Sequence, residues 1–332
     1  MFKINRIDLS LIVIFTFLVS SCQVTGTWTD GNIDPKIEDA VEQVNIRAVN
    51  SLRENNPDAL VSLCSDPLLA VANKQALTNL VHAAHEIILV KSRFEIKKRF
   101  YMKTTAKGAL VKVASGATSD HNYEITFRTN TTETMVMVGE FTSAYQTVLL
   151  LAVYGNYNSQ WKLNILKVGI NKLLYKDAIA WYKEARSSYN SSDTIDAFNK
   201  LSIANKLLKP GGEYWTYDKE KEIREWTANM QQVTGKRYHF PVALVVNRLP
   251  VSIIGISPQF LYNYYPEITY VSTLPLSDTK AQEKECDSVH HLARKIFPYL
   301  ARNNDTILYR AFNDAPKTGK EQSYGFARAT RF

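Results

Sequence analysis

The sequence predicts an α+β protein: helices followed by an antiparallel sheet, then a helical segment and a smaller α+β unit. Apolar residues recur every three to four positions over residues 35–89, as in amphipathic helices. They recur at even spacing over 90–170, between turns rich in glycine, asparagine and serine, as in half-buried strands. The helical period returns over 171–234, and residues 235–332 mix both periods.

Residues 1–21 have the three parts of a secretory signal peptide: a short basic start, an apolar run over 9–19 and small residues before Cys22. The run is much shorter than the about 20 residues of a membrane-spanning helix, so we expect it to be cleaved. Val19-Ser20-Ser21-Cys22 resembles the lipobox of bacterial lipoproteins. The resemblance implies that acyl chains on Cys22 anchor the protein to a membrane. The alternative is an ordinary signal peptide followed by an unmodified cysteine.

The residues after the cysteine indicate a location. Gln23 stands where, by resemblance to the sorting pattern of enteric bacteria, an aspartate would retain a lipoprotein in the inner membrane. Residues 23–29 carry no charge, unlike the acidic run that marks surface export in some lipoproteins of the Bacteroidetes type. We therefore expect an outer-membrane lipoprotein that faces the periplasm. Residues 22–34 are mostly polar, and we expect them to form a tether.

Three helices are predicted within residues 35–89. Asp34 followed by Pro35 is typical of a helix start, with an N-cap residue before proline at the first helical position. The apolar period of this first helix ends before Asn56-Pro57. Second and third helices are expected at 57–64 and 73–86.

Residues 90–170 predict an antiparallel meander. Its strands are indicated by alternating apolar side chains, including Phe94, Ile96, Tyr123, Ile125, Phe127, Met135, Met137, Leu149, Leu151, Leu163 and Ile165. With the preceding helices, and with an apolar strand, a polar turn and Trp-Lys-Leu in the last hairpin (YGNYNSQWKL, 154–163), residues 35–170 resemble the NTF2-like, cystatin-related α+β cone. The resemblance implies a sheet that curves around a pocket.

Some NTF2-like relatives place an acidic base and tyrosine donors in that pocket. The resemblance therefore implies candidate pocket residues here, namely Tyr101, Asp120, His121, Tyr123 and Glu140. Strand alternation puts Tyr123 on the inward face with Ile125 and Phe127, whereas Asp120 and His121 precede the strand in a turn. A non-catalytic cup is the favoured interpretation, and catalysis is the alternative.

The segment 171–234 contains a helical pair that resembles one tetratricopeptide repeat. The matching small and aromatic positions are Trp181 and Ala185 on the first helix, and Ala197, Leu201 and Ala204 on the second. Pro210 falls one place late, and Ser188 stands where the family has an aromatic residue. Because about three repeats are needed for a stable solenoid, an ordinary helical hairpin is the alternative. A further helix is expected at 217–232.

Residues 235–332 predict a small α+β unit of no recognised family. The expected strands are 240–247, 252–256, 268–274, 306–312 and 323–329. One helix is expected over 281–302, and Pro298 is expected to kink it or end it early.

Composition and motifs disfavour several functions. The formal net charge of +8 is modest, and no motif predicts nucleic-acid binding, a phosphate loop or a dinucleotide site. Cys286 and His290 share a helix face but lack the further ligands of a zinc site, so we expect no metal and no cofactor. Cys64 and Cys286 lie in different predicted domains, which favours two buried thiols over a disulfide.

Two short motifs suggest modification. Asp193-Thr194-Ile195 and Asp305-Thr306-Ile307 resemble the O-glycosylation sequon of Bacteroidetes, which implies possible glycans on Thr194 and Thr306. Three-residue matches also arise by chance.

The sequence thus favours a membrane-anchored envelope lipoprotein that binds or scaffolds another envelope protein without catalysis. The alternative is a small apolar ligand or lipid held in the cone of residues 35–170. An exposed apolar patch on residues 171–234 would favour the protein partner. A cavity under the sheet would favour the ligand.

Overall fold

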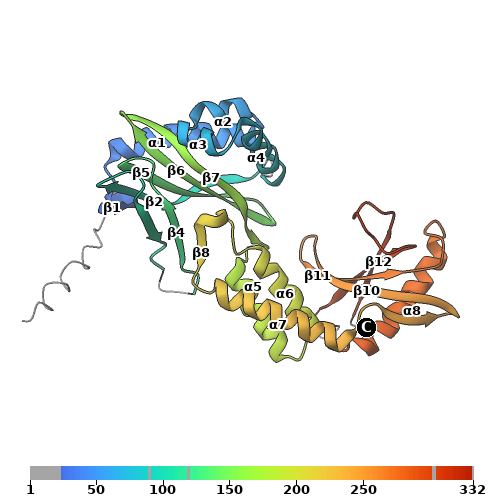
Figure 1. The fold of residues 1–332 in the computed structure, drawn as a ribbon. Coiled ribbons are helices and arrows are strands. Elements are labelled where there is room, and N and C mark those ends of the chain that lie inside the picture. The colour runs from blue at the N-terminus through green and yellow to red at the C-terminus, as the bar shows by residue number, and fades with distance from the viewer. Residues whose placement is uncertain (1–23, 89–90, 118–119, 301–303, 331–332) are drawn as a thin grey trace, which may run out of the picture.

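A computed structural model describes residues 24–88, 91–117, 120–300 and 304–330. The fold is α+β, as predicted, and most of its strand pairs are antiparallel. Helices cover one face of an N-terminal sheet, a helical segment follows, and a second sheet lies at the far end of the molecule (Figure 1). The predicted signal peptide and Cys22 fall outside the described residues. Within the described part of the chain, no helix is both long and apolar enough to cross a membrane.

Four helices with side-chain N-caps cover the first sheet. They are α1 (Pro35–Arg53), α2 (Pro57–Leu63), α3 (Asp66–Val71) and α4 (Lys74–Ile87), capped by Asp34, Asn56, Ser65 and Asn73. In each, the cap side chain accepts a hydrogen bond from a backbone N–H of the first turn, which satisfies a donor that the helix leaves free. The three predicted helices are confirmed, and the short α3 was not predicted.

The first sheet has the order β1-β2-β5-β6-β7. Its strands are β1 (Val24–Thr29), β2 (Arg93–Thr104), β5 (Glu133–Thr142), β6 (Gln146–Tyr157) and β7 (Gln160–Leu173). The inner strands β5 and β6 are buried on both faces, which explains the unbroken apolar run of residues 147–154. Met135, Leu150 and Tyr154 pack under α1–α4, whereas Val136, Leu149 and Leu151 face a second core.

The prediction of a tether over residues 22–34 is wrong for residues 24–29, which form strand β1. Residues 24–29 pair with β2, with Val24 opposite Thr104 and Thr29 opposite Phe100. A 3₁₀ turn (Asp30–Asn32) then leads directly into α1, and Ile33 is buried in the helix-covered core. Residues 24–29 (VTGTWT) alternate between partly buried and exposed positions, as an edge strand does. The strand was not predicted because its residues are mostly small and polar.

The second face of the first sheet is covered by a three-stranded sheet and three helices. The small sheet has the order β3-β4-β8, from β3 (Leu110–Ala114), β4 (Tyr123–Arg128) and β8 (Trp215–Tyr217). The helices are α5 (Ala178–Asn190), α6 (Thr194–Lys206) and α7 (Glu220–Tyr238). The boundary predicted at residue 170 is therefore not a structural break, because β8 returns from the helical segment to pair with β4.

The C-terminal unit matches its predicted elements closely. The sheet order is β13-β12-β11-β10-β9, from β9 (Val242–Val246), β10 (Leu249–Phe260), β11 (Tyr264–Val271), β12 (Thr306–Phe312) and β13 (Tyr324–Ala329). Only the β11–β12 pair in this sheet is parallel, and α8 (Thr279–Ile296) provides the crossover between those strands. The helix ends before Pro298, as expected, because proline disfavours helical geometry at the preceding residue.

Candidate functional site

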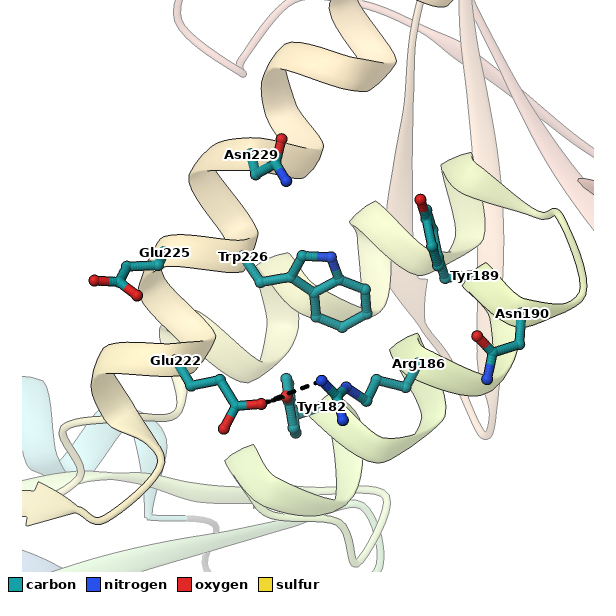
Figure 2. A pocket seen from close by; sticks show the side chains of 8 residues that line it. All are labelled: Tyr182, Arg186, Tyr189, Asn190, Glu222, Glu225, Trp226 and Asn229. Atoms are coloured by element: carbon teal, nitrogen blue, oxygen red, sulfur yellow. Dashed lines mark hydrogen bonds and ion pairs between the residues drawn. The ribbon is translucent and has the colours of Figure 1, made fainter.

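An open groove lies between α5 and α7, on the surface of the helical segment. Its volume is about 540 Å³. Figure 2 shows its lining, which comprises Tyr182, Arg186, Tyr189 and Asn190 of α5 with Glu222, Glu225, Trp226 and Asn229 of α7.

Helical spacing accounts for this lining. Tyr182, Arg186 and Tyr189 are four and three residues apart, so they share one face of α5. Trp181, Ala185 and Ser188 each lie one residue earlier and are buried on the inner face. Trp226 is four residues after Glu222 on α7, so the aromatic ring and the carboxylate project from the same side of that helix (Figure 2).

Three aromatic rings form the apolar part of the groove. The Trp226 ring meets Tyr182 edge-on at a centroid distance of 5.6 Å and Tyr189 at 5.9 Å. Such edge-to-face contacts hold the rings in fixed positions. Tyr189 remains 47% exposed, so much of its surface is open to a binding partner.

The polar part of the groove is organised around Arg186 and Glu222. The Arg186 guanidinium lies over the Tyr182 ring at 5.2 Å and pairs with Glu222 at 3.2 Å (Figure 2). The Tyr182 hydroxyl also donates to Glu222, and Lys219 Nζ lies 2.8 Å from the same side chain.

These contacts set the protonation of the groove. The hydrogen bond from Lys219 and that from Tyr182 hold the pKa of Glu222 below its usual range. Burial, together with the hydrogen bond to Glu222, raises the pKa of Tyr182 to about 12. At neutral pH the groove therefore presents an ionised carboxylate, a neutral phenol and a guanidinium.

The groove is suited to binding rather than to a reaction. Its partly buried acid–hydroxyl contact joins an ionised Glu222 to a phenol with a raised pKa, which makes neither a ready nucleophile nor a free base. Within the described residues, no group of three or more histidine, cysteine, aspartate or glutamate side chains is placed to hold a metal ion. Exposed aromatic faces beside amides and charges are typical of protein-binding surfaces.

The structure separates the pocket residues predicted from the cone resemblance. Tyr101 packs in the core under α1–α4, whereas Tyr123 packs in the core on the other face of the sheet. Tyr123 stacks on Trp215 of β8 at 3.7 Å. Burial and, second, the nearby charge of Glu140 raise the pKa of Tyr123. The charge of Glu140 thus acts on Tyr123, whereas Tyr101 lies in the other core and is not part of the same site.

The polar members of that predicted set are engaged in structural contacts. Glu140 is buried and accepts hydrogen bonds from Asn171 at 2.7 Å and Lys172 at 3.0 Å. Asp120 pairs with Lys183 at 3.0 Å.

His121 Nδ1 lies 2.6 Å from Asp177, whose other carboxylate oxygen caps α5. Asp120 and His121 thus fasten the start of β4 to α5. The face expected to line a cup is packed by Trp215 and by α5 and α6, because these later elements fold back onto the sheet.

The groove residues were missed by sequence reasoning. The helical pattern predicts α5 from Trp181 and Ala185 on its inner face, whereas the groove is lined by the neighbouring positions Tyr182 and Tyr189. Tyr182 and the exposed Tyr189, seven residues apart on one helix face, are a signal that could have indicated it. The pairing with Trp226 needs the tertiary structure.

The predicted modification sites have different environments. Thr194 is the first residue of α6 and is buried, and its Oγ1 accepts a hydrogen bond from Arg237 at 3.0 Å. The Thr194 hydroxyl is therefore poorly accessible in the folded protein. Thr306 begins β12, is partly exposed and pairs with Ala329.

The two described cysteines are buried thiols in separate cores, as favoured from sequence. Cys64 lies in the core under α1–α4, and Cys286 lies beneath α8. His290, which shares a helix face with Cys286, places its Nδ1 2.8 Å from the Tyr309 hydroxyl.

Comparison with protein-family models, characterised proteins and solved structures gave no match to this chain.

Proposed function

We propose that this protein is an envelope lipoprotein, anchored through acylated Cys22 to the outer membrane and facing the periplasm, with a non-catalytic protein-binding role. The observation that carries the proposal is the groove between α5 and α7. It gathers three aromatic side chains, exposed amides and both signs of charge on the segment 171–234. The corresponding evidence for an apolar ligand is weaker, because both faces of the first sheet are packed by other elements.

Two finer structural assignments belong to the same proposal. Helices followed by a curved antiparallel meander support an NTF2-like origin for residues 35–170, with its cup filled by β8 and α5–α6. The burial of Trp181, Ala185, Ala197, Leu201 and Ala204 between neighbouring elements supports a tetratricopeptide-like helical pair. In this interpretation α7 takes the place of the next repeat and forms the far wall of the groove.

The groove chemistry favours an extended polypeptide segment as the partner. Trp226 and Tyr189 offer apolar edges for a side chain of the segment, and Asn190 and Asn229 are exposed amides that can bond its backbone. Glu225 is 69% exposed and only weakly paired with Lys221 at 3.8 Å, so it is free to receive a basic side chain.

Affinity isolation from crosslinked native membranes tests this role. Wild-type protein is compared with Tyr189→Ala and with Tyr145→Ala, a matched control because Tyr145 is 49% exposed on another surface. We expect a specific envelope protein to be recovered with wild type and Tyr145→Ala but lost with Tyr189→Ala. Equal recovery with all three proteins would contradict a partner in this groove.

A further inference from the structure

The start of β1 fixes one end of the first sheet close to the lipid. Only Gln23 separates Cys22 from Val24, the first residue of β1. Two extended residues span at most about 7 Å, so acyl chains on Cys22 would hold this end of the sheet at the membrane surface. The inference rests on the lipidation of Cys22 in the proposed function.

Strand register shows which segments share that end. Val24 lies opposite Thr104, Lys103 opposite Glu133, and Thr134 opposite Gly155. The end is therefore formed by segments 103–109, 128–133 and 155–162, which we call the anchor end. The C-terminal sheet lies at the opposite end of the molecule from β1 (Figure 1).

The loops of the anchor end are held by backbone hydrogen bonds. The Gly108 N–H donates to the Thr129 carbonyl at 2.7 Å, and the Thr104 N–H donates to the Thr132 carbonyl at 2.8 Å. Arg128 adds a hydrogen bond from its guanidinium to the Gly108 carbonyl at 3.0 Å. These bonds tie the first two segments together, so the surface is preformed.

The chemistry of the anchor end is basic and amphipathic. Its charged side chains are Lys103, Lys107, Arg128, Lys162 and a single acid, Glu133. Glu133 pairs with Lys103 at 3.2 Å, whereas Lys107 and Lys162 have no ion pair among the described residues. A groove of about 450 Å³ lies here, lined by Lys107, Thr131, Thr132, Glu133, Asn156, Tyr157, Asn158 and Ser159.

We propose that the anchor end docks on the headgroups of anionic phospholipids, so that lipidation and surface charge together orient the protein on the membrane. Lysines held near an anionic surface are attracted to it, and hydroxyl and amide groups can bond phosphate oxygens. Tyr157 and Trp161 at this end suit the interface between headgroups and acyl chains. With this orientation the C-terminal sheet points away from the bilayer.

Chemical lipidation tests the proposal without the cellular pathway or any protein partner. Protein that begins at Cys22 is coupled to a maleimide lipid in vesicles of phosphatidylcholine, with or without phosphatidylglycerol. Coupling is selective because Cys64 and Cys286 are buried, and burial raises the pKa of their thiols to about 11 and about 12. Hydrogen exchange of the anchor-end segments reports docking, and sedimentation of cysteine-capped protein with the same vesicles reports affinity.

We expect protection of residues 104–109 and 157–160 only on anionic vesicles. The double variant Lys107→Glu with Lys162→Glu should abolish that protection. It should also lower the affinity for anionic vesicles, measured by sedimentation, by at least about fivefold for each lysine. The matched control, Lys280→Glu with Lys284→Glu on exposed positions of α8, should leave both unchanged. Equal protection on neutral vesicles, or equal losses with the control, would overturn the proposal. Metabolic fatty-acid labelling of wild type and Cys22→Ser reports cellular lipidation separately.

Discussion

The Tyr264 hydroxyl donates a hydrogen bond of 2.6 Å to the fully buried carboxylate of Asp196, which joins the C-terminal sheet to α6. The same carboxylate group accepts from Ser188 Oγ at 2.7 Å and pairs with Lys200 at 2.7 Å. The Trp181 ring packs against Tyr264 at a centroid distance of 5.7 Å. The C-terminal unit is thus fixed to the helical segment by a buried polar network and an aromatic contact.

Removing the Asp196 carboxylate, which all three partners share, should lower the stability of the fold. Asp196→Ala leaves Tyr264, Ser188 and Lys200 without their shared acceptor, and we expect it to lower the free energy of unfolding by about 3 kcal/mol. Asp58→Ala is the control, because Asp58 is 79% exposed in its pair with Lys74 and should contribute less than about 1 kcal/mol. Urea unfolding followed by fluorescence measures both, and similar losses would refute the role of Asp196.

Glu285 on α8 should make stability depend on pH. Its side chain is buried, and burial raises its pKa above the usual 4.5, against a smaller opposing contribution from the Ser272 hydroxyl. The folded state therefore binds this proton more tightly than the unfolded state. The stabilising contribution is complete below pH 4.5 and is lost as the pH rises through the folded-state pKa.

Glu285→Gln removes that ionisation. At pH 8 we expect the variant to unfold at a higher urea concentration than wild type, with a free energy of unfolding that is larger by at least about 1 kcal/mol. Near pH 4 we expect this difference to disappear. Glu283→Gln, an exposed neighbour on the same helix, should show no such trend. A pH-independent difference between Glu285→Gln and wild type would contradict this account of the buried carboxyl.

Groove substitutions should separate binding from folding. Tyr189→Ala removes a half-exposed ring, so we expect less than about 1 kcal/mol of lost stability but more than about tenfold weaker partner binding. Trp226→Ala also removes packing against Tyr182 and should destabilise the fold by about 2 kcal/mol. Thermal unfolding with titration of an isolated partner measures the two effects. Parallel losses of stability and affinity for Tyr189→Ala would argue against direct contact.

The buried thiols should resist modification in the native state. Protein lacking Cys22 should show no reaction of Cys64 or Cys286 with a thiol reagent until denaturant is added, because both side chains are buried and their pKa values are raised. Two thiols should then react together. Rapid native labelling, or no labelling after unfolding without reductant, would exclude two buried free thiols.

Local signals explain which elements could be predicted from sequence. Asp34-Pro35 and the apolar period located α1, and alternation located the strands of the C-terminal sheet. Strand β8 could not be predicted, because three residues are too few to show an alternating pattern. Its pairing with β4 also joins positions far apart in the chain. The packing of Trp215, α5 and α6 on the second face of the first sheet could not be predicted either, because it also joins distant parts of the chain. Whether Tyr123 meets a ligand or Trp215 depends on where a later segment folds back.

The proposed function places a protein partner in the groove between α5 and α7. Site-specific photocrosslinking in growing cells tests it most directly, with a benzophenone amino acid replacing Tyr189 or, as the matched control, Tyr145. We expect a discrete adduct with one envelope protein from position 189 and none from position 145. Identical adducts at both positions, or none at position 189 in a correctly exported protein, would contradict it.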